Sequence, residues 1–383
     1  MISRRALIGG LVGAGALALA AAWRLGWLGP LPGVKKPPLG MTLTPEQKAA
    51  GAAIIRQFPS VDVHAHPGRS FLKGAEGLYP SVKLLGGPRE REAFADLRAS
   101  GLSAACFSTV SDLRLLALGK DGIRAQREFE PGEAYADYLR QIALIQEIAR
   151  RDQFLAVLAP GDISAAHDSG KTGVIMACEG GDFIETRLER VQKAYDDGVR
   201  IITIVHYHIN DIGDIQTEAP RHGGLTPFGA EVIGEMNRLG MIIDLAHAPF
   251  ALVKKAVALT TRPVLLSHSN LISETAHHPR LISPDHARAI AETGGAIGAW
   301  PAGIGNATFA DFIDQIFRLV DVVGIDHVAI GSDMDANYKP VFYNYRQLPL
   351  IPAMLLARGM AADEVAKVVG GNFIRMFSAV AAV

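Results

Sequence analysis

The sequence of 383 residues has only two cysteines, Cys106 and Cys178, and both lie inside apolar runs. Their spacing is not that of a zinc knuckle, so we expect two buried, reduced thiols rather than a disulfide. The chain also has no excess of either charge, because 38 Lys and Arg balance 39 Asp and Glu. This balance gives no electrostatic footprint for nucleic acid or an anionic surface. Function must therefore come from a local site.

The first 28 residues differ in kind from the rest of the chain. Arg4 and Arg5 precede an uncharged run of 18 residues, 6–23, that is rich in Ala, Gly and Leu. Paired arginines before an apolar run are typical of a bacterial twin-arginine export signal. The run is also near the lower limit for crossing a bilayer. We therefore expect residues 1–28 to be an export signal or a retained membrane anchor, with the protein periplasmic or facing the periplasm.

A Pro/Gly-rich segment, 29–43, follows and cannot build a core, so we expect a linker. The remaining residues, 44–383, suffice for one large α/β barrel. Beyond residue 58, short apolar or β-branched runs alternate with segments of helical periodicity. Eight such runs predict strands: 61–66, 103–110, 173–179, 200–206, 241–247, 263–269, 295–300 and 328–333.

The helical periodicity is clearest at 226–239, where Thr226 suits the N-cap and Pro227 the first turn. Further helices are expected at 186–197, 249–259, 284–293, 309–322 and 362–379. Strands that alternate with helices eight times predict a closed (β/α)₈ TIM barrel. An open doubly wound sheet is the alternative, but the first strand lacks the glycine turn of nucleotide-binding folds.

Polar side chains stand where the predicted strands end. In a (β/α)₈ barrel the C-terminal ends of all strands meet at one mouth, where active sites lie. The residues in this position are His64, His66, Glu179, His206, His247, His268 and Asp333. His64 and His66 are one residue apart, so they share one face of an extended strand. Two imidazoles on one face supply half of a metal site.

Each of these residues also has a purely structural interpretation. His247 and His268 suit hydrogen-bonded core histidines, and Asp333 suits a cap of the next segment. Glu179 is more informative, because a carboxylate that ends an apolar strand is costly to bury unless it is paired or bound to metal. Their joint position at strand ends favours a site. Polar residues without such a position are expected in loops or behind the site: Asp335, His208, His277 and His278.

Seven motifs occur in a specific order: "HAH", "EGG", "ITIVH", "GLTPFGAEVIGEMNRLGMIIDLAH", "LLSHSN", "HPR" and "IGSDMD". Together they resemble the membrane (renal-type) dipeptidases, peptidase family M19 of the amidohydrolase superfamily, from about residue 58 to residue 377. The resemblance implies a binuclear zinc barrel. It implies hydrolysis of dipeptides, or of closely related N-acyl amino acid amides, by a metal-bridging hydroxide. It also makes a homodimer an expectation.

The resemblance implies roles for individual residues. His64 and His66 would bind the first zinc ion, and His247 and His268 the second. Glu179 would bridge the two ions. The expected cofactor is thus two Zn²⁺ per chain, although manganese or iron are alternatives at a site of mixed nitrogen and oxygen ligands.

Three further residues receive roles by position in the same motifs. Asp333 aligns with the catalytic acid/base, His206 with the histidine that contacts the scissile carbonyl, and Arg280 with the arginine that holds the substrate carboxylate. Members of the family commonly have Asp where this chain has His66. Imidazole still binds zinc, so the exchange removes a negative charge. We hypothesise a more acidic bridging water or more anionic substrates, which the pH–rate profile of His66→Asp tests.

Two other classes of protein fit parts of the pattern. TatD-like metal-dependent deoxyribonucleases carry similar ligands on a barrel, but a phosphodiester substrate calls for basic residues at the mouth. The near-zero net charge gives no such indication, and no nucleic-acid partner is expected. An exported binding protein without turnover is the other alternative. Its mark would be a missing ligand, whereas every position here is filled.

Overall fold

The computed structural model describes residues 36–83, 86–119, 122–274 and 276–382. The predicted signal or anchor, residues 1–28, and the first part of the predicted linker lie outside these residues. No helix in the described ranges has the length and hydropathy needed to cross a membrane. The end of the predicted linker packs on the folded domain, because Leu43 is buried and the Pro38 carbonyl accepts a hydrogen bond from the Phe309 N–H.

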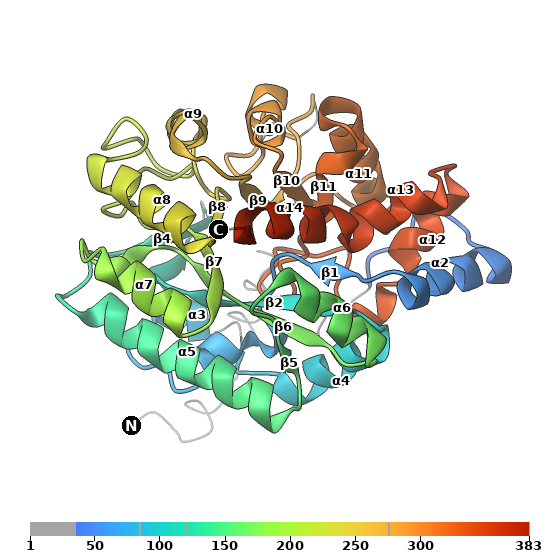
Figure 1. The fold of residues 1–383 in the computed structure, drawn as a ribbon, viewed down its shortest axis with the longest axis horizontal. Helices are drawn as coiled ribbons and strands as arrows, with labels where there is room; N and C mark the ends of the chain where they lie inside the picture. Colours follow the sequence, from blue (N-terminus) through green and yellow to red (C-terminus); the bar gives the residue numbers. More distant parts are fainter. Residues whose placement is uncertain (1–35, 84–85, 120–121, 275, 383) are drawn as a thin grey trace, which may run out of the picture.

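Eight parallel strands close into a barrel, as the sequence predicts (Figure 1). They are β1 (Val61–Asp62), β2 (Ala104–Val110), β6 (Gly173–Glu179), β7 (Val199–Thr203), β8 (Ile242–Asp244), β9 (Leu265–Ser269), β10 (Ala296–Ala299) and β11 (Val328–Ile330). The order around the barrel is β1-β2-β6-β7-β8-β9-β10-β11, and β1 pairs with both β2 and β11. The (β/α)₈ fold is therefore confirmed.

The helices pack around the strands, mostly on the outside of the barrel (Figure 1), whereas Phe373 and Phe377 of the last helix pack with inward-facing residues of the strands. The helices are α2 (Pro45–Gln57), α3 (Pro80–Lys83), α4 (Glu90–Ser100), α5 (Glu133–Arg151), α6 (Pro160–Asp168), α7 (Glu189–Asp196), α8 (Pro227–Leu239), α9 (Phe250–Leu259), α10 (Pro284–Ala291), α11 (Phe309–Val323), α12 (Leu350–Ala357), α13 (Ala362–Ala366) and α14 (Asn372–Ala381). In α8 the Thr226 hydroxyl accepts the Gly229 N–H at 2.9 Å, and Pro227 opens the first turn. This helix confirms its prediction.

Parts of the architecture differ from the predictions. The expected helix 362–379 is broken at Gly370, which has non-helical backbone angles. Only glycine fits there, because a Cβ would come within 2.3 Å of the Pro59 carbonyl oxygen. The loop after β2 contains an antiparallel hairpin, β3 (Leu116–Gly119) and β4 (Gly122–Ala125). A short strand, β5 (Leu155–Ala156), pairs with β6 outside the closed barrel.

The strands β1 and β8 end earlier than predicted, and buried carboxylates explain this. Asp62 accepts the His64 N–H at 3.3 Å, and Asp244 accepts the Ala246 N–H at 3.0 Å. A side chain that takes the amide two residues later replaces ladder pairing with a local turn. The regular ladder ends there, although single backbone hydrogen bonds continue beyond it, as from the Val63 N–H to Ile330 and from the Leu245 N–H to Leu265.

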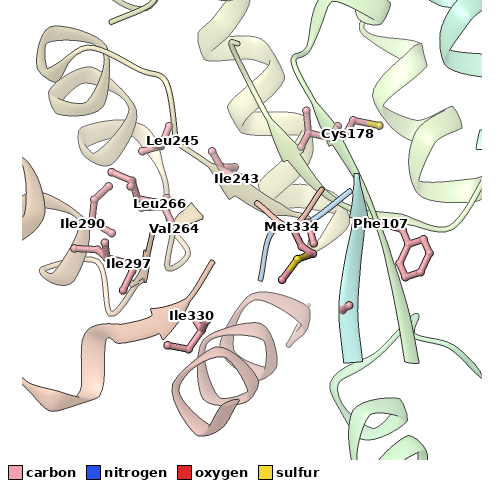
Figure 2. Close-up of a cluster of buried hydrophobic side chains, with 14 of the residues drawn as sticks. Phe107, Cys178, Ile243, Leu245, Val264, Leu266, Ile290, Ile297, Ile330 and Met334 are labelled. Atoms are coloured by element: carbon pink, nitrogen blue, oxygen red, sulfur yellow. The ribbon is translucent and has the colours of Figure 1, made fainter. Parts of the chain in front are cut away.

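Apolar side chains pack on both faces of the strands. Figure 2 shows part of the outer layer, in which Val264, Leu266 and Ile297 of the barrel lie near Ile290 of α10. The inner layer includes alternate residues of β6, Ile175 and Ala177. Successive side chains of a strand alternate between faces, so Glu179 shares the inner face with them. Cys106 and Cys178 are buried free thiols, as predicted.

Candidate metal centre at the mouth of the barrel

His64 and His66 lie just after β1, at the C-terminal end of the barrel. Both side chains are buried. The Nε2 atom of His64 is 3.1 Å from Glu179 Oε1, and that of His66 is 3.2 Å from Glu179 Oε2. The other ring nitrogen of His66, Nδ1, donates to the Ser108 carbonyl at 3.1 Å. That hydrogen bond leaves the Nε2 lone pair directed at the mouth, as in metal-binding histidines.

His247 follows β8, and His268 lies in the neighbouring strand β9. Their Nε2 atoms are 3.1 Å apart and lie 3.2 Å and 3.6 Å from Glu179 Oε1. His247 has a positive φ of 67°, an uncommon conformation for a residue other than glycine. Burial holds the pKa of both imidazoles well below the usual range. Both rings are therefore neutral, the form that binds metal.

Glu179 ends β6 at the centre of the cluster. Burial alone would raise the pKa of its carboxyl, but the charges of His206 and His64 outweigh burial and hold the pKa well below its usual range. The ionised carboxylate belongs to two groups of ligand atoms: His64, His66 and Glu179, and Glu179, His247 and His268. The rings of His64 and His268 stack at 4.1 Å, so the two groups adjoin.

The residues of this cluster fit a pair of divalent cations. The Nε2 atoms of His64 and His66 are buried and make no hydrogen bond within the described part of the chain, although each lies close to a Glu179 oxygen. Unsatisfied buried nitrogens are costly in a protein interior, and a bound cation would satisfy them. Imidazole nitrogen with carboxylate oxygen is a donor set typical of zinc. Each group can hold one cation, with Glu179 shared.

Asp333 lies after β11, beside the first group. Its Oδ1 atom is 3.6 Å from His66 Nε2, and its φ is 52°. Burial raises the pKa of its carboxyl to about 6. A carboxyl held near neutral pH at the edge of a metal site is suited to proton transfer. It belongs to neither group of ligand atoms.

His206 follows β7, and its Nε2 atom is 3.3 Å from Glu179 Oε2. Its Nδ1 atom donates to Asp112 at 2.7 Å, and Asp112 also accepts the Tyr207 N–H at 2.9 Å. Burial alone would lower the pKa of His206, but the charges of Asp112 and Glu179 raise it. Asp112 is a site residue that the sequence analysis missed. The only signal was its position two residues beyond the predicted strand 103–110.

Arg280 lies after β9 and is fully buried. Its Nη1 atom donates to Gln216 at 2.6 Å, and its Nη2 atom is 2.9 Å from His268 Nε2. Its guanidinium is 5.5 Å from the centre of the Trp300 ring. The Nε atom has no hydrogen-bond partner among the described residues. A buried cation with an unused donor at the mouth is suited to an anionic ligand.

The polar residues expected outside the cluster are distributed as follows. His208 is held between Asp182 and Glu128, each at 2.7 Å. Asp335 accepts the Gly68 N–H at 2.7 Å. His278 accepts the Arg280 N–H at 3.1 Å and His277 is exposed. None of these residues belongs to either group of ligand atoms.

A cavity of about 550 Å³ opens onto the cluster. Glu179, His247, His268, Arg280 and Asp333 line it. Pockets that enclose small ligands commonly measure roughly 300–1,000 Å³. The candidate metal centre is therefore accessible to a small ligand.

The fold and the site together define a closed barrel with two candidate metal-ligand groups at its mouth. Residues 48–383 match the model of the membrane dipeptidases, peptidase family M19, and the chain belongs to that family. Among curated relatives, dipeptidase aclJ of Aspergillus oryzae is 30% identical over 66% of this chain and 64% of its own length. Dipeptidase verJ of Clonostachys rogersoniana is 29% identical over 63% and 64%. The chain thus spans somewhat less than two thirds of these relatives.

Solved structures share the fold. The probable dipeptidase PvdM of Pseudomonas aeruginosa superposes with a TM-score of 0.72 at 19% identity, over 88% of this chain and 99% of that one. An amidohydrolase of Pseudomonas aeruginosa gives a TM-score of 0.69 at 24% identity, over 86% and 99%.

Proposed function

We propose that this chain is a binuclear, zinc-dependent dipeptidase. The observation that carries the proposal is the single carboxylate of Glu179, which lies within 3.6 Å of Nε2 atoms from four histidines of two ligand groups. The family and its dipeptidase relatives support the same activity. A small peptide is accordingly the proposed substrate.

When bound, a pair of zinc ions would supply Lewis acidity and would lower the pKa of water enough to make a nucleophile available near neutral pH. The protein's own residues would do the rest. Arg280 would pair with the terminal carboxylate of the substrate. His206, held by Asp112, would donate from Nε2 to the developing oxyanion. Asp333 would take a proton from the nucleophile and pass it to the leaving amine.

A dipeptide panel tests the proposal directly. Zinc-loaded protein should release free amino acids, a chelator should abolish the release, and added zinc should restore it. His268→Ala should lose both zinc and activity, while His277→Ala, which changes an exposed histidine, should keep both. Cleavage of single-stranded DNA instead of dipeptides would assign the barrel to nucleases. Peptide binding without turnover would make it a binding protein.

Export is part of the same proposal. The twin-arginine segment and the name of the family favour a periplasmic or membrane-attached enzyme. Replacing Arg4 and Arg5 with lysine should leave the full-length protein in the cytoplasm. Unchanged export would exclude the twin-arginine route.

A further inference from the structure

The two ends of the cavity come from opposite sides of the barrel. In the strand order, β2 and β9 are four positions apart in either direction. Arg280 follows β9, whereas Val110 ends β2 and Leu113 and Leu116 follow it. All four residues line the cavity, as does Glu179 of the metal centre. A substrate held by Arg280 would extend toward the β2 side across the metal ligands.

The β2 side of the cavity is apolar. We call it the apolar wall, formed by Phe71, Val82, Val110, Leu113, Leu116 and Ile123. Tyr207 packs against these residues, and its ring lies 4.9 Å from that of His247. The apolar wall is therefore continuous with the metal centre, and a group bound there would adjoin the scissile bond.

The charges near the apolar wall do not suit an ammonium group. Among the described lining residues the carboxylates are Glu179, Asp333 and Asp335. The first two belong to the metal centre and its acid/base. Asp335 already accepts the Gly68 N–H at 2.7 Å, and its backbone carbonyl accepts from Arg69 at 2.6 Å. Arg69 and Arg124, both cationic, also line the cavity. An unpaired ammonium buried there would be costly.

We propose that the preferred substrate is an amino acid with a free carboxylate and a bulky, uncharged, apolar N-acyl group. This inference rests on the proposed function, since it uses the Arg280 clamp and the metal centre. In the reaction, water adds to the acyl carbon and the C–N bond breaks. The products are a carboxylate and an amino acid whose nitrogen receives a proton from water. The apolar wall binds the acyl group, and Arg280 binds the carboxylate at the other end.

A matched pair of substrates separates this proposal from ordinary dipeptidase specificity. N-(3-phenylpropanoyl)-alanine differs from phenylalanyl-alanine only by lacking the ammonium group. With zinc-loaded protein, and with both enantiomers of alanine, we expect its kcat/KM to exceed that of the dipeptide by about tenfold or more. It should exceed N-acetyl-alanine by a similar factor, because even a single methylene in an apolar pocket is worth roughly 10–200-fold.

Each outcome of this comparison decides one claim. An equal or higher kcat/KM for phenylalanyl-alanine overturns the acyl preference while the dipeptidase proposal stands. A preference for N-acetyl-alanine overturns the role of the apolar wall. If zinc is bound and none of the compounds is cleaved, the proposed function itself fails.

A variant tests the wall by reversing the preference. Ile123→Glu places a carboxylate on the partly buried lining. It should shift the ratio of kcat/KM toward phenylalanyl-alanine by about tenfold or more, because the new charge pairs with the ammonium. Leu158→Glu alters a residue outside the cavity that is 46% exposed and serves as the matched control. Since the readout is a ratio within one protein sample, partial unfolding does not affect it. An unchanged ratio overturns the assignment of the wall.

Discussion

The two ligand groups share Glu179 but have different neighbours. The first group, with His64 and His66, lies beside the carboxyl of Asp333, 3.6 Å from His66. The second, with His247 and His268, lies beside the guanidinium of Arg280, 2.9 Å from His268. A negatively charged carboxylate stabilises a nearby metal cation, whereas a positively charged guanidinium destabilises one. We therefore expect the first group to hold its metal ion more tightly than the second.

Replacing the shared ligand should have the largest effect, because it breaks both groups at once. In Glu179→Gln the amide cannot neutralise either cation, so both metal ions should be lost and activity should fall to background. The loss of affinity should exceed the roughly 10- to 100-fold that follows removal of an outer-shell partner. Metal content by mass spectrometry measures it. If one equivalent stayed bound, the bridging role would be wrong.

Removing the acid beside the first group should reduce the rate and leave the metal in place. Asp333→Asn should lower kcat by roughly 10² to 10⁴, as loss of a proton-transfer group does. Metal content should be unchanged, because Asp333 belongs to neither ligand group. Loss of zinc from this variant would make Asp333 chiefly a ligand. Asp285→Asn, at an exposed aspartate, is the control.

Removing the guanidinium of Arg280 beside the second group should reduce the difference in zinc affinity between the two ligand groups. In Arg280→Ala the more weakly held zinc ion should bind more tightly, which a zinc titration measures. KM for dipeptides should rise by about 10- to 100-fold, the worth of a charge-assisted hydrogen bond. KM for the matching dipeptide amides, which lack the terminal carboxylate, should change little. Equal losses on both substrates would refute the clamp. Arg288→Ala, at an exposed arginine, is the control.

Asp112 contacts neither ligand group and acts through His206, so its effect should be smaller. In Asp112→Asn the hydrogen bond that orients the imidazole of His206 should weaken. The pKa of His206 should also fall, because the negative charge of Asp112 helps to raise it. We expect kcat to fall by about tenfold with both metal ions retained. The pH–rate profile should also shift, a change that a purely structural role would not produce. Asp211→Asn, at an exposed aspartate in the segment after β7, should match the parent.

The two groups also differ in how far the sequence predicts them. His64 and His66 form a local motif, so spacing alone indicates their shared face. His247 and His268 become partners only once the strands close into a barrel, and the regular alternation of strands and helices supplied that closure. Asp112 was missed because a single carboxylate in a loop belongs to no periodic pattern that would indicate its position. The β3–β4 hairpin was missed because its Gly-rich, charged sequence resembles a loop.

The smallest expected effect is on thermal stability in metal-free protein. It concerns Asp333, the acid beside the first ligand group. The pKa of Asp333, about 6 in the folded state, lies above its ordinary value of 3.8 because the carboxyl is buried. The folded protein therefore holds this proton more tightly than the unfolded chain, and its contribution to stability falls as pH rises from about 4 to 6. After chelation, Asp333→Asn should melt about a few degrees above the parent at pH 7. The difference should vanish near pH 4, where both side chains are neutral. If the difference in melting temperature were the same at pH 7 and pH 4, ionisation of Asp333 would not be its cause. The buried charge beside His64 and His66 would then not distinguish the first ligand group from the second.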